Sequence, residues 1–235
     1  MPAGEAGTAV IMPVLNEAAA LRTLLAALRT GGFAEIVVVD GGSADGSPGL
    51  VEAAMARPGT PIRLICAERG RARQMNAGAA ESRASILLFL HADTHLPQDA
   101  ARAIHSVIQR GAVWGRFDVQ LDSPRLLLRV VAWFMNRRSA LTGICTGDQA
   151  IFVRREAFVR LGGYAPIPLM EDIELSRRLR RLGPPARLRT PVVSSARRWE
   201  QGGVLRTILQ MWRLRLLYWL GVPAERLVQQ YKAVR

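Results

Sequence analysis

The chain has 235 residues, of which 49% are hydrophobic and 22% charged. This composition supplies a sizeable core and excludes a wholly disordered chain. Two cysteines, Cys66 and Cys145, are too few for a disulfide scaffold or a thiolate zinc site. The start of the chain lacks the pattern of a signal peptide, and no run approaches the ~20 apolar residues of a spanning helix. We therefore expect a soluble, cytoplasmic protein.

The net charge of +13 is concentrated in the second half of the chain. Of the 32 basic and 19 acidic residues, 11 of each lie in residues 1–120, which leaves 21 basic and 8 acidic residues for 121–235. Such asymmetry indicates an anionic partner for this half, namely nucleic acid, anionic lipid or a phosphorylated substrate. An ordinary basic soluble surface is the alternative.

Strand and helix patterns alternate over the first 95 residues. We expect strands at 8–14, 35–40, 61–67 and 85–90. Helices are expected at 17–30 and 71–82, and another runs to about residue 57 after the turn at residues 41–43. This alternation predicts right-handed βαβ units and a parallel sheet.

The second half is less regular. We expect strands at 112–121 and 150–154 and helices at 125–138, 171–182 and 203–220. The helix at 171–182 is expected to carry four arginines on its outer face, namely Arg177, Arg178, Arg180 and Arg181.

Polar residues gather where three predicted strands end. The first strand leads to Asn16 and Glu17, the second to Asp40 and Ser43, and the fourth to His91, Asp93 and His95. Ligands bind beyond the carboxyl ends of parallel strands, so these residues predict a site, although a single strand-end acid is more often a helix cap. No glycine-rich dinucleotide fingerprint or P-loop is present.

His91 and Asp93 share one side of an extended segment and could face one ion. A carboxylate together with substrate phosphates is the usual setting for Mg²⁺ or Mn²⁺, and an imidazole favours Mn²⁺.

Ordered motifs carry a family resemblance. Residues 13–17 (PVLNE), 37–46 (VVVDGGSADG), 76–78 and 89–93 (FLHAD), then 147–155, 161–164 and 170–175, resemble the inverting family 2 glycosyltransferases of the GT-A fold, in a small bacterial subgroup. The resemblance implies an α/β, Rossmann-like and mostly parallel sheet in one domain, residues 1–200. Residues 1–95 would bind the nucleotide sugar, 96–200 would form the acceptor side, and 201–235 a C-terminal helical extension.

The resemblance also implies transfer of a sugar from a nucleoside diphosphate donor, a UDP-sugar first of all, to an acceptor hydroxyl with inversion. Asp172 would be the general base, supported by Glu171, and the acceptor side would include Gly147, Asp148 and Gln149. The donor site would comprise Pro13, Asn16, Glu17, Asp40, Gly42, Ser43, Asn76, Ala92 and Asp93. Arg71 or Arg73 would replace the arginine that the family often has where Met75 stands.

A divalent cation, Mn²⁺ or Mg²⁺, would bind Asp93, the second acid position of the family's D-x-D motif. His91 stands at the first position, as a weaker ligand or an orienting partner.

Other functions fit less well. A nucleotidyltransferase would have a glycine-rich basic loop after the first strand, where residues 16–20 read NEAAA. A nucleic-acid-binding protein is disfavoured by 6% aromatic residues and dispersed charge, so we expect no nucleic-acid partner. A catalytically inactive scaffold is disfavoured because Asp40, Asp93 and Asp172 are all present.

The segment 204–220 is apolar nearly all round, and something must cover it. The cover could be the domain's own core, a second copy in a homodimer, or an anionic membrane at the cytoplasmic face, where Trp212, Tyr218 and Trp219 would sit well. We expect cover by protein, because such stripes are commoner in cores.

Overall fold

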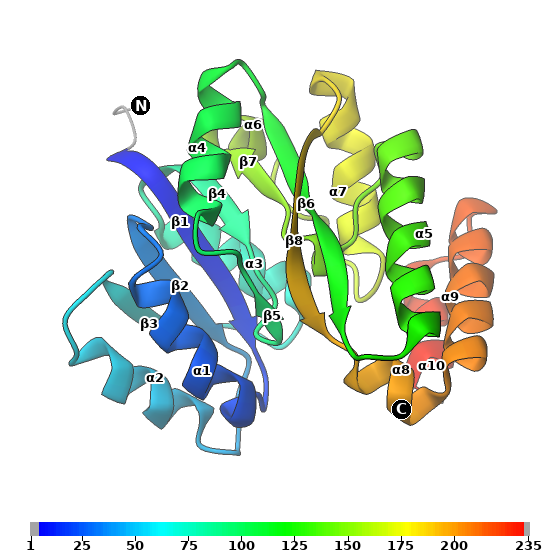
Figure 1. The fold of residues 1–235 in the computed structure, drawn as a ribbon, viewed down its shortest axis with the longest axis horizontal. Coiled ribbons are helices and arrows are strands. Elements are labelled where there is room, and N and C mark those ends of the chain that lie inside the picture. The colour runs from blue at the N-terminus through cyan, green and yellow to red at the C-terminus, as the bar shows by residue number, and fades with distance from the viewer. Residues whose placement is uncertain (1–4, 233–235) are drawn as a thin grey trace.

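The computed structural model describes residues 5–232 and contains one eight-stranded sheet in this range (Figure 1). The strand order is β3-β2-β1-β4-β7-β6-β8-β5. The strands are β1 (Glu5–Val14), β2 (Glu35–Asp40), β3 (Ile62–Cys66), β4 (Ala84–Phe89), β5 (Thr94–His95), β6 (Trp114–Asp122), β7 (Phe152–Arg154) and β8 (Ala186–Ser195).

Helices cover both faces of the sheet. They are α1 (Ala18–Arg29), α2 (Ser47–Met55), α3 (Arg71–Glu81), α4 (Ala100–Gln109), α5 (Leu126–Thr142), α6 (Arg155–Arg160), α7 (Glu171–Leu179), α8 (Arg197–Gly202), α9 (Val204–Trp219) and α10 (Ala224–Lys232). Alternate residues of β1 enter two separate cores: Val10 and Met12 pack with α1 and α4, whereas Ala9 and Ile11 pack with α3. Burial on both faces explains why this strand is a continuous apolar run.

The first half is the parallel sheet that the alternation predicts. Strand β1 pairs in parallel with β2 and β4, and β2 pairs in parallel with β3. The carboxyl ends of these strands therefore share one edge of the sheet. Strand β7 runs antiparallel to β4, so the 3₁₀ turn Gly147–Gln149 that precedes β7 comes to the same edge.

From residue 94 onward the chain contains elements that the sequence pattern does not predict: β5, α4, α6, β8 and α8. The ten residues of β8 include Arg187, Arg189 and Pro191, and this polar composition is not typical of a strand. The strand is held by parallel pairing with β6 and by an ion pair between Arg187 and Asp118 at 2.7 Å. Tertiary pairing thus overrides local propensity here.

Two helix predictions need correction. Helix α5 continues to Thr142, and α7 ends at Leu179 and is followed by a 3₁₀ turn, Arg180–Leu182. Arg178 does not lie on the outer face of α7. It donates hydrogen bonds to the carbonyl oxygens of Leu161 and Gly163 and pairs with Glu174, because the loop after α6 packs against this side of the helix.

The C-terminal helices pack on the domain through one side only. In α9, Thr207 and Leu214 are buried, and Leu214 joins Met170 and Leu227 in a small core. The opposite side is exposed, with Trp212 66% and Trp219 77% accessible. We expected protein to bury the apolar surface of α9. In this single chain the domain buries one face of the helix and leaves the opposite face exposed. None of the helices within 5–232 combines the length and apolar character needed to span a bilayer.

Candidate active site

The turn after β2 presents a carboxylate with one oxygen unused. Asp40 is 4% exposed, and its Oδ2 accepts hydrogen bonds from the backbone N–H groups of Gly42 (2.8 Å) and Ser43 (3.0 Å). Its Oδ1 is buried and has no hydrogen-bond partner among residues 5–232. Buried polar atoms are rarely left unsatisfied, so this oxygen is poised to accept a hydrogen bond from a ligand.

The loop after β1 is fixed against the loop after β2. Asn16 adopts a positive φ of 57°, its N–H donates to Ser43 Oγ, and its Oδ1 accepts from Ala44 N–H. Asp45 accepts from Ala18 N–H at 2.9 Å, which ties the start of α1 to the same loop. These contacts build a rigid rim beside Asp40.

The side chain of Glu17 is turned toward the second half of the chain. Both of its carboxylate oxygens lie 3.3 Å from Arg197 Nη2 at the start of α8. Pro13 and Ala92, predicted to line the donor site, are buried in the strand and the loop that flank this rim.

Helix α3 joins three parts of the site. Gln74, which the sequence reasoning missed, is buried and donates to the carbonyl oxygens of Val14 (2.9 Å) and Val39 (2.7 Å) at the ends of β1 and β2. Asn76 exchanges two hydrogen bonds of 2.8 Å with the backbone of Tyr164. The sequence feature that could have identified Gln74 is a polar residue next to Met75 on the buried face of a helix that directly follows a strand.

His91 packs into the turn before β7. Its Nδ1 lies 3.4 Å from Asp148 Oδ1, and a Cβ built on Gly147 would lie 2.4 Å from Nε2. Only glycine therefore fits at position 147 while the ring keeps this position. Within the described residues, the half-buried side chain of Asp93 makes no hydrogen bond or ion pair, although its carbonyl oxygen accepts from Ser195 N–H.

The start of α7 brings a second group of acids to this edge. Asp172 accepts from Gly147 N–H through Oδ2 (2.8 Å) and from its neighbour Ile173 N–H through Oδ1 (2.7 Å). Glu171 is 6% exposed beside it. We call Asp148, Glu171 and Asp172 the carboxylate cluster.

Charges within the cluster shift the pKa values of its members. Burial, followed by the charge of Asp172, raises the pKa of Glu171. Burial opposes ionisation of Asp148 as well, but hydrogen bonding and charge from His91, followed by the charge of Arg71, lower its pKa overall. Within one cluster, the pKa of Glu171 is thus raised and the pKa of Asp148 is lowered.

The two candidate arginines of α3 differ in their surroundings. Arg71 is exposed; its partial desolvation would lower its pKa, but the charges of nearby acidic groups, led by Glu171, raise the pKa overall. Arg73 instead pairs with Glu68 at 2.7 Å, with both side chains exposed. Of the two, Arg71 is the one whose charge acts on the cluster.

Gln149, predicted on the acceptor side, is fully buried, and its amide lies 3.3 Å from Asn136 Oδ1. The described residues contain no group of three or more His, Cys, Asp or Glu side chains arranged to hold a metal ion. A carboxylate plus substrate phosphates is a common Mg²⁺ donor set, so the unengaged carboxylate of Asp93 fits a metal that the donor completes.

The model of glycosyl transferase family 2 matches residues 9–161. An undecaprenyl-phosphate 4-deoxy-4-formamido-L-arabinose transferase of Pseudomonas paraeruginosa is 37% identical over 156 residues, which are 62% of this chain and 45% of that protein. The same transferase of Pseudomonas aeruginosa is 36% identical over 110 residues, 44% of this chain and 32% of that protein. The chain thus spans less than half the length of these curated relatives.

Solved structures show the same fold. Residues 1–349 of Staphylococcus aureus TarS in complex with UDP superpose with a TM-score of 0.66 at 16% identity, over 80% of this chain and 60% of that one. The mannosyltransferase PcManGT of Pyrobaculum calidifontis, with GDP-Man and Mn²⁺, gives 0.62 at 21% identity, over 88% and 64%. Glucosyl-3-phosphoglycerate synthase of Mycobacterium tuberculosis, with Mn²⁺ and UDP, gives 0.62 at 18% identity, over 92% and 81%. The predicted GT-A fold is confirmed, and the chain belongs to glycosyl transferase family 2.

Proposed function

We propose that the protein transfers a sugar from a nucleoside diphosphate sugar, a UDP-sugar first of all, to an acceptor hydroxyl with inversion at the anomeric carbon. The observation that carries this proposal is the placement of two different carboxylates at one sheet edge. Asp40 has a buried oxygen without a partner, and Asp172 is held by two backbone N–H groups at the start of α7. The first suits recognition of a nucleoside, and the second suits chemistry on an acceptor.

Asp40 Oδ1 would accept a hydrogen bond from the base or ribose of the donor. The two N–H groups on Oδ2 hold the carboxylate in place, so its orientation is fixed before the donor binds, although the atoms that cover Oδ1 must move to admit the donor. The contacts of Asn16 with Ser43 and Ala44 hold the loop after β1 against the loop after β2, beside Asp40.

Asp172 would take the proton of the acceptor hydroxyl as its oxygen attacks. A general base needs a fixed position within hydrogen-bond reach of that proton, and the N–H groups of Gly147 and Ile173 fix this carboxylate. Glu171 and Arg71 stand beside it and set the local charge.

Asp93 would hold a divalent cation, which would neutralise charge on the leaving diphosphate. His91 was expected to be either a weaker metal ligand or an orienting partner. Its position beside Asp148 and Gly147 supports the orienting role. Arg71, close to the carboxylate cluster, is the better placed of the two arginines to meet an anionic donor group.

The test is a panel of nucleotide sugars incubated with Mn²⁺ or Mg²⁺ and simple acceptors, with the released nucleotide and the anomeric configuration of the product measured by NMR. Release of a nucleoside diphosphate and an inverted product support the proposal. Pyrophosphate formed from a sugar phosphate and a nucleoside triphosphate would instead identify a nucleotidyltransferase, and a retained anomer would refute the role of Asp172.

A further inference from the structure

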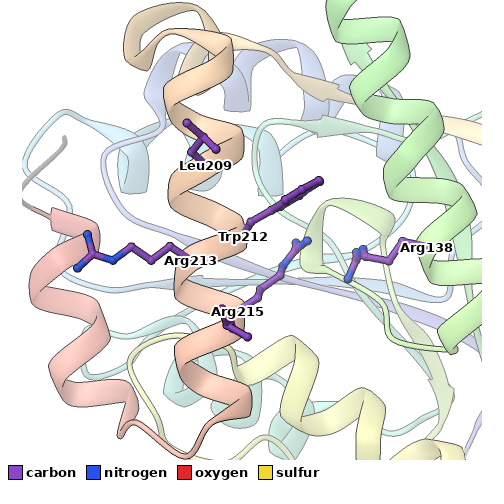
Figure 2. Close-up of a pocket in the computed structure, with 6 residues that line it drawn as sticks. Arg138, Leu209, Trp212, Arg213 and Arg215 are labelled. Atoms are coloured by element: carbon purple, nitrogen blue, oxygen red, sulfur yellow. The ribbon is translucent and has the colours of Figure 1, made fainter.

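Two arginines face each other between α5 and α9, and the described part of the chain supplies no acidic partner to either of them. Figure 2 shows Arg215 extending from α9 toward Arg138 on α5. The Nε and Nη2 atoms of Arg138 are buried and make no hydrogen bond. Within residues 5–232, neither guanidinium forms an ion pair.

The charges of this arginine pair are unfavourable in their surroundings. Burial, and after it the charge of Arg215, lowers the pKa of Arg138 to about 10. Burial also lowers the pKa of Arg215, and Asp172 offsets part of the shift in both. Buried charges are normally paired, so an anion is the component that would complete this arrangement. Guanidinium groups match the oxygens of a phosphate with paired hydrogen bonds.

The surroundings of the pair are apolar. A cavity between the helices, of about 510 Å³ and widely open to the surface, is lined by Arg138, Leu209, Trp212, Arg213, Arg215 and Leu216. Leu209 is 67% exposed and Leu216 is 56% exposed, so the cavity opens onto an apolar surface. Free phosphate gains nothing from apolar walls, whereas a lipid phosphate brings its own hydrocarbon to them.

The surface around the cavity has the composition of a membrane-facing one. We call it the α5–α9 face; the two helices lie side by side in Figure 1, and Leu128 of α5 belongs to a core against which Ile208 of α9 packs. Its exposed apolar side chains are Leu126, Leu127, Val130, Trp133, Phe134 and Leu141 of α5, and Leu205, Leu209, Trp212, Leu216 and Trp219 of α9. Six arginines and no acidic residue lie in the two helices. Tryptophan and arginine beside exposed leucines are typical of helices that lie in the interface of an anionic membrane.

A second copy of the chain fits this face less well. Two copies meeting through it would bring arginines against arginines, with no acid in either helix to pair with them. Like charges at an interface cost several kcal/mol. The charge therefore favours an anionic lipid surface over a homodimer.

We propose that the α5–α9 face rests on an anionic membrane and that Arg138 and Arg215 together bind the phosphate monoester of a lipid headgroup. Asp172 acts electrostatically on both arginines, so the arginine pair lies on the side of the domain that carries the carboxylate cluster. This inference goes beyond the proposed function and does not depend on it, because binding is measured without turnover.

The test is flotation of the full chain with phosphatidylcholine vesicles that contain phosphatidic acid, a monoester, or phosphatidylglycerol, a diester, adjusted to equal zeta potential. The pair R138Q/R215Q is compared with the matched pair R129Q/R206Q, which removes one exposed arginine from each of the same helices. A third pair, L209S/W212S, removes apolar surface. Thermal unfolding of every variant confirms that it is folded.

The wild type is expected to prefer phosphatidic acid by about tenfold, which corresponds to one charge-assisted hydrogen bond. R138Q/R215Q should lose this preference, R129Q/R206Q should weaken binding to both vesicles equally, and L209S/W212S should abolish flotation. Equal binding of the two lipids by the wild type, or equal loss of the preference in both arginine pairs, would overturn the phosphate site. Absence of flotation together with a dimer that L209S/W212S dissociates would overturn the membrane assignment.

Discussion

The free oxygen of Asp40 allows nucleotide recognition to be separated from folding. In Asp40→Asn, a carbonyl oxygen can still accept from the N–H groups of Gly42 and Ser43, but an NH₂ group replaces the oxygen that has no partner. If Oδ1 accepts a hydrogen bond from the nucleoside, the variant presents a donor to a donor. Loss of a hydrogen bond to a charged group costs about 1.5–3 kcal/mol, so the Kd of the nucleotide should rise by about 10- to 150-fold.

The same substitution should leave the fold nearly unchanged. Removing a buried charged oxygen without a partner is favourable, whereas weakening two charge-assisted hydrogen bonds and burying an NH₂ group are unfavourable. We expect these effects to cancel to within about 1 kcal/mol, which is a shift of about 2–4 °C in the Tm of a chain of this size.

Asp45 supplies the matched control from the same loop. Its carboxylate accepts from Ala18 N–H and Ser47 N–H, and hydrogen bonding, first with the Ser47 hydroxyl, lowers its pKa. Asp45→Asn should therefore lower the Tm more than Asp40→Asn does, with a smaller effect on nucleotide affinity. Calorimetric titration with UDP and GDP, alongside thermal unfolding, measures both. Wild-type UDP affinity in Asp40→Asn, or a loss of Tm equal to that of Asp45→Asn, would refute the reasoning.

Four further substitutions test the rest of the site. Asp172→Asn should reduce turnover by about 10²–10⁴-fold with donor affinity nearly intact, and an equal loss of donor binding would show that its role is structural. Asp93→Ala should abolish the dependence of donor binding on Mn²⁺, measured by calorimetry with and without the metal; an unchanged dependence would contradict its assignment. The raised pKa of Glu171 means that the folded state holds this proton more tightly than the unfolded state does. Wild-type stability therefore falls as the pH rises from about 4.5 through the pKa of the folded state. Glu171→Gln should raise the Tm at neutral pH but change it little in acid. Gly147→Ala should lower the Tm by about 2–12 °C through about 1–3 kcal/mol of overpacking against His91, and the added change His91→Ala should restore most of it.

The donor half of the fold follows from local patterns. Each strand from β1 to β3 is followed by a predicted helix, and β4 ends this series. Parallel pairing places the polar ends of the strands together, so Asp40 and Asp93 come to one edge. The predicted bounds of β2, residues 35–40, agree with the bounds in the structure. Asp40 marks the end because it is the first polar residue after a run that is buried on both faces of the sheet.

The remainder depends on contacts that no local pattern contains. Strand β8 forms because β6 is beside it, and the pattern of its own residues is polar. The pairing of Arg138 with Arg215 depends on how α5 and α9 pack, and the sequence shows only two basic residues in apolar helices. The exposure of one apolar face of α9 was likewise not predictable. The same apolar pattern occurs in helices that pack in a core, against a partner protein or against lipid.

The hydrogen bonds between Asn76 and Tyr164 have a consequence for the order of folding. They close a loop of 88 residues, whereas β1 pairs with β2 and β2 with β3 across much shorter separations, as in Ala9 with Glu35 and Ile36 with Ile62. Closure entropy grows with loop length, and contacts between distant residues slow folding. Strands β1 to β3 can therefore assemble while the later chain is still disordered. The long-range contacts join afterwards, through pairing of β4 with β1, the short β4–β7 ladder and the packing of Tyr164 against Phe89. If so, Asn76→Ala should mainly accelerate unfolding in stopped-flow experiments; a change confined to the folding rate would place this junction early instead.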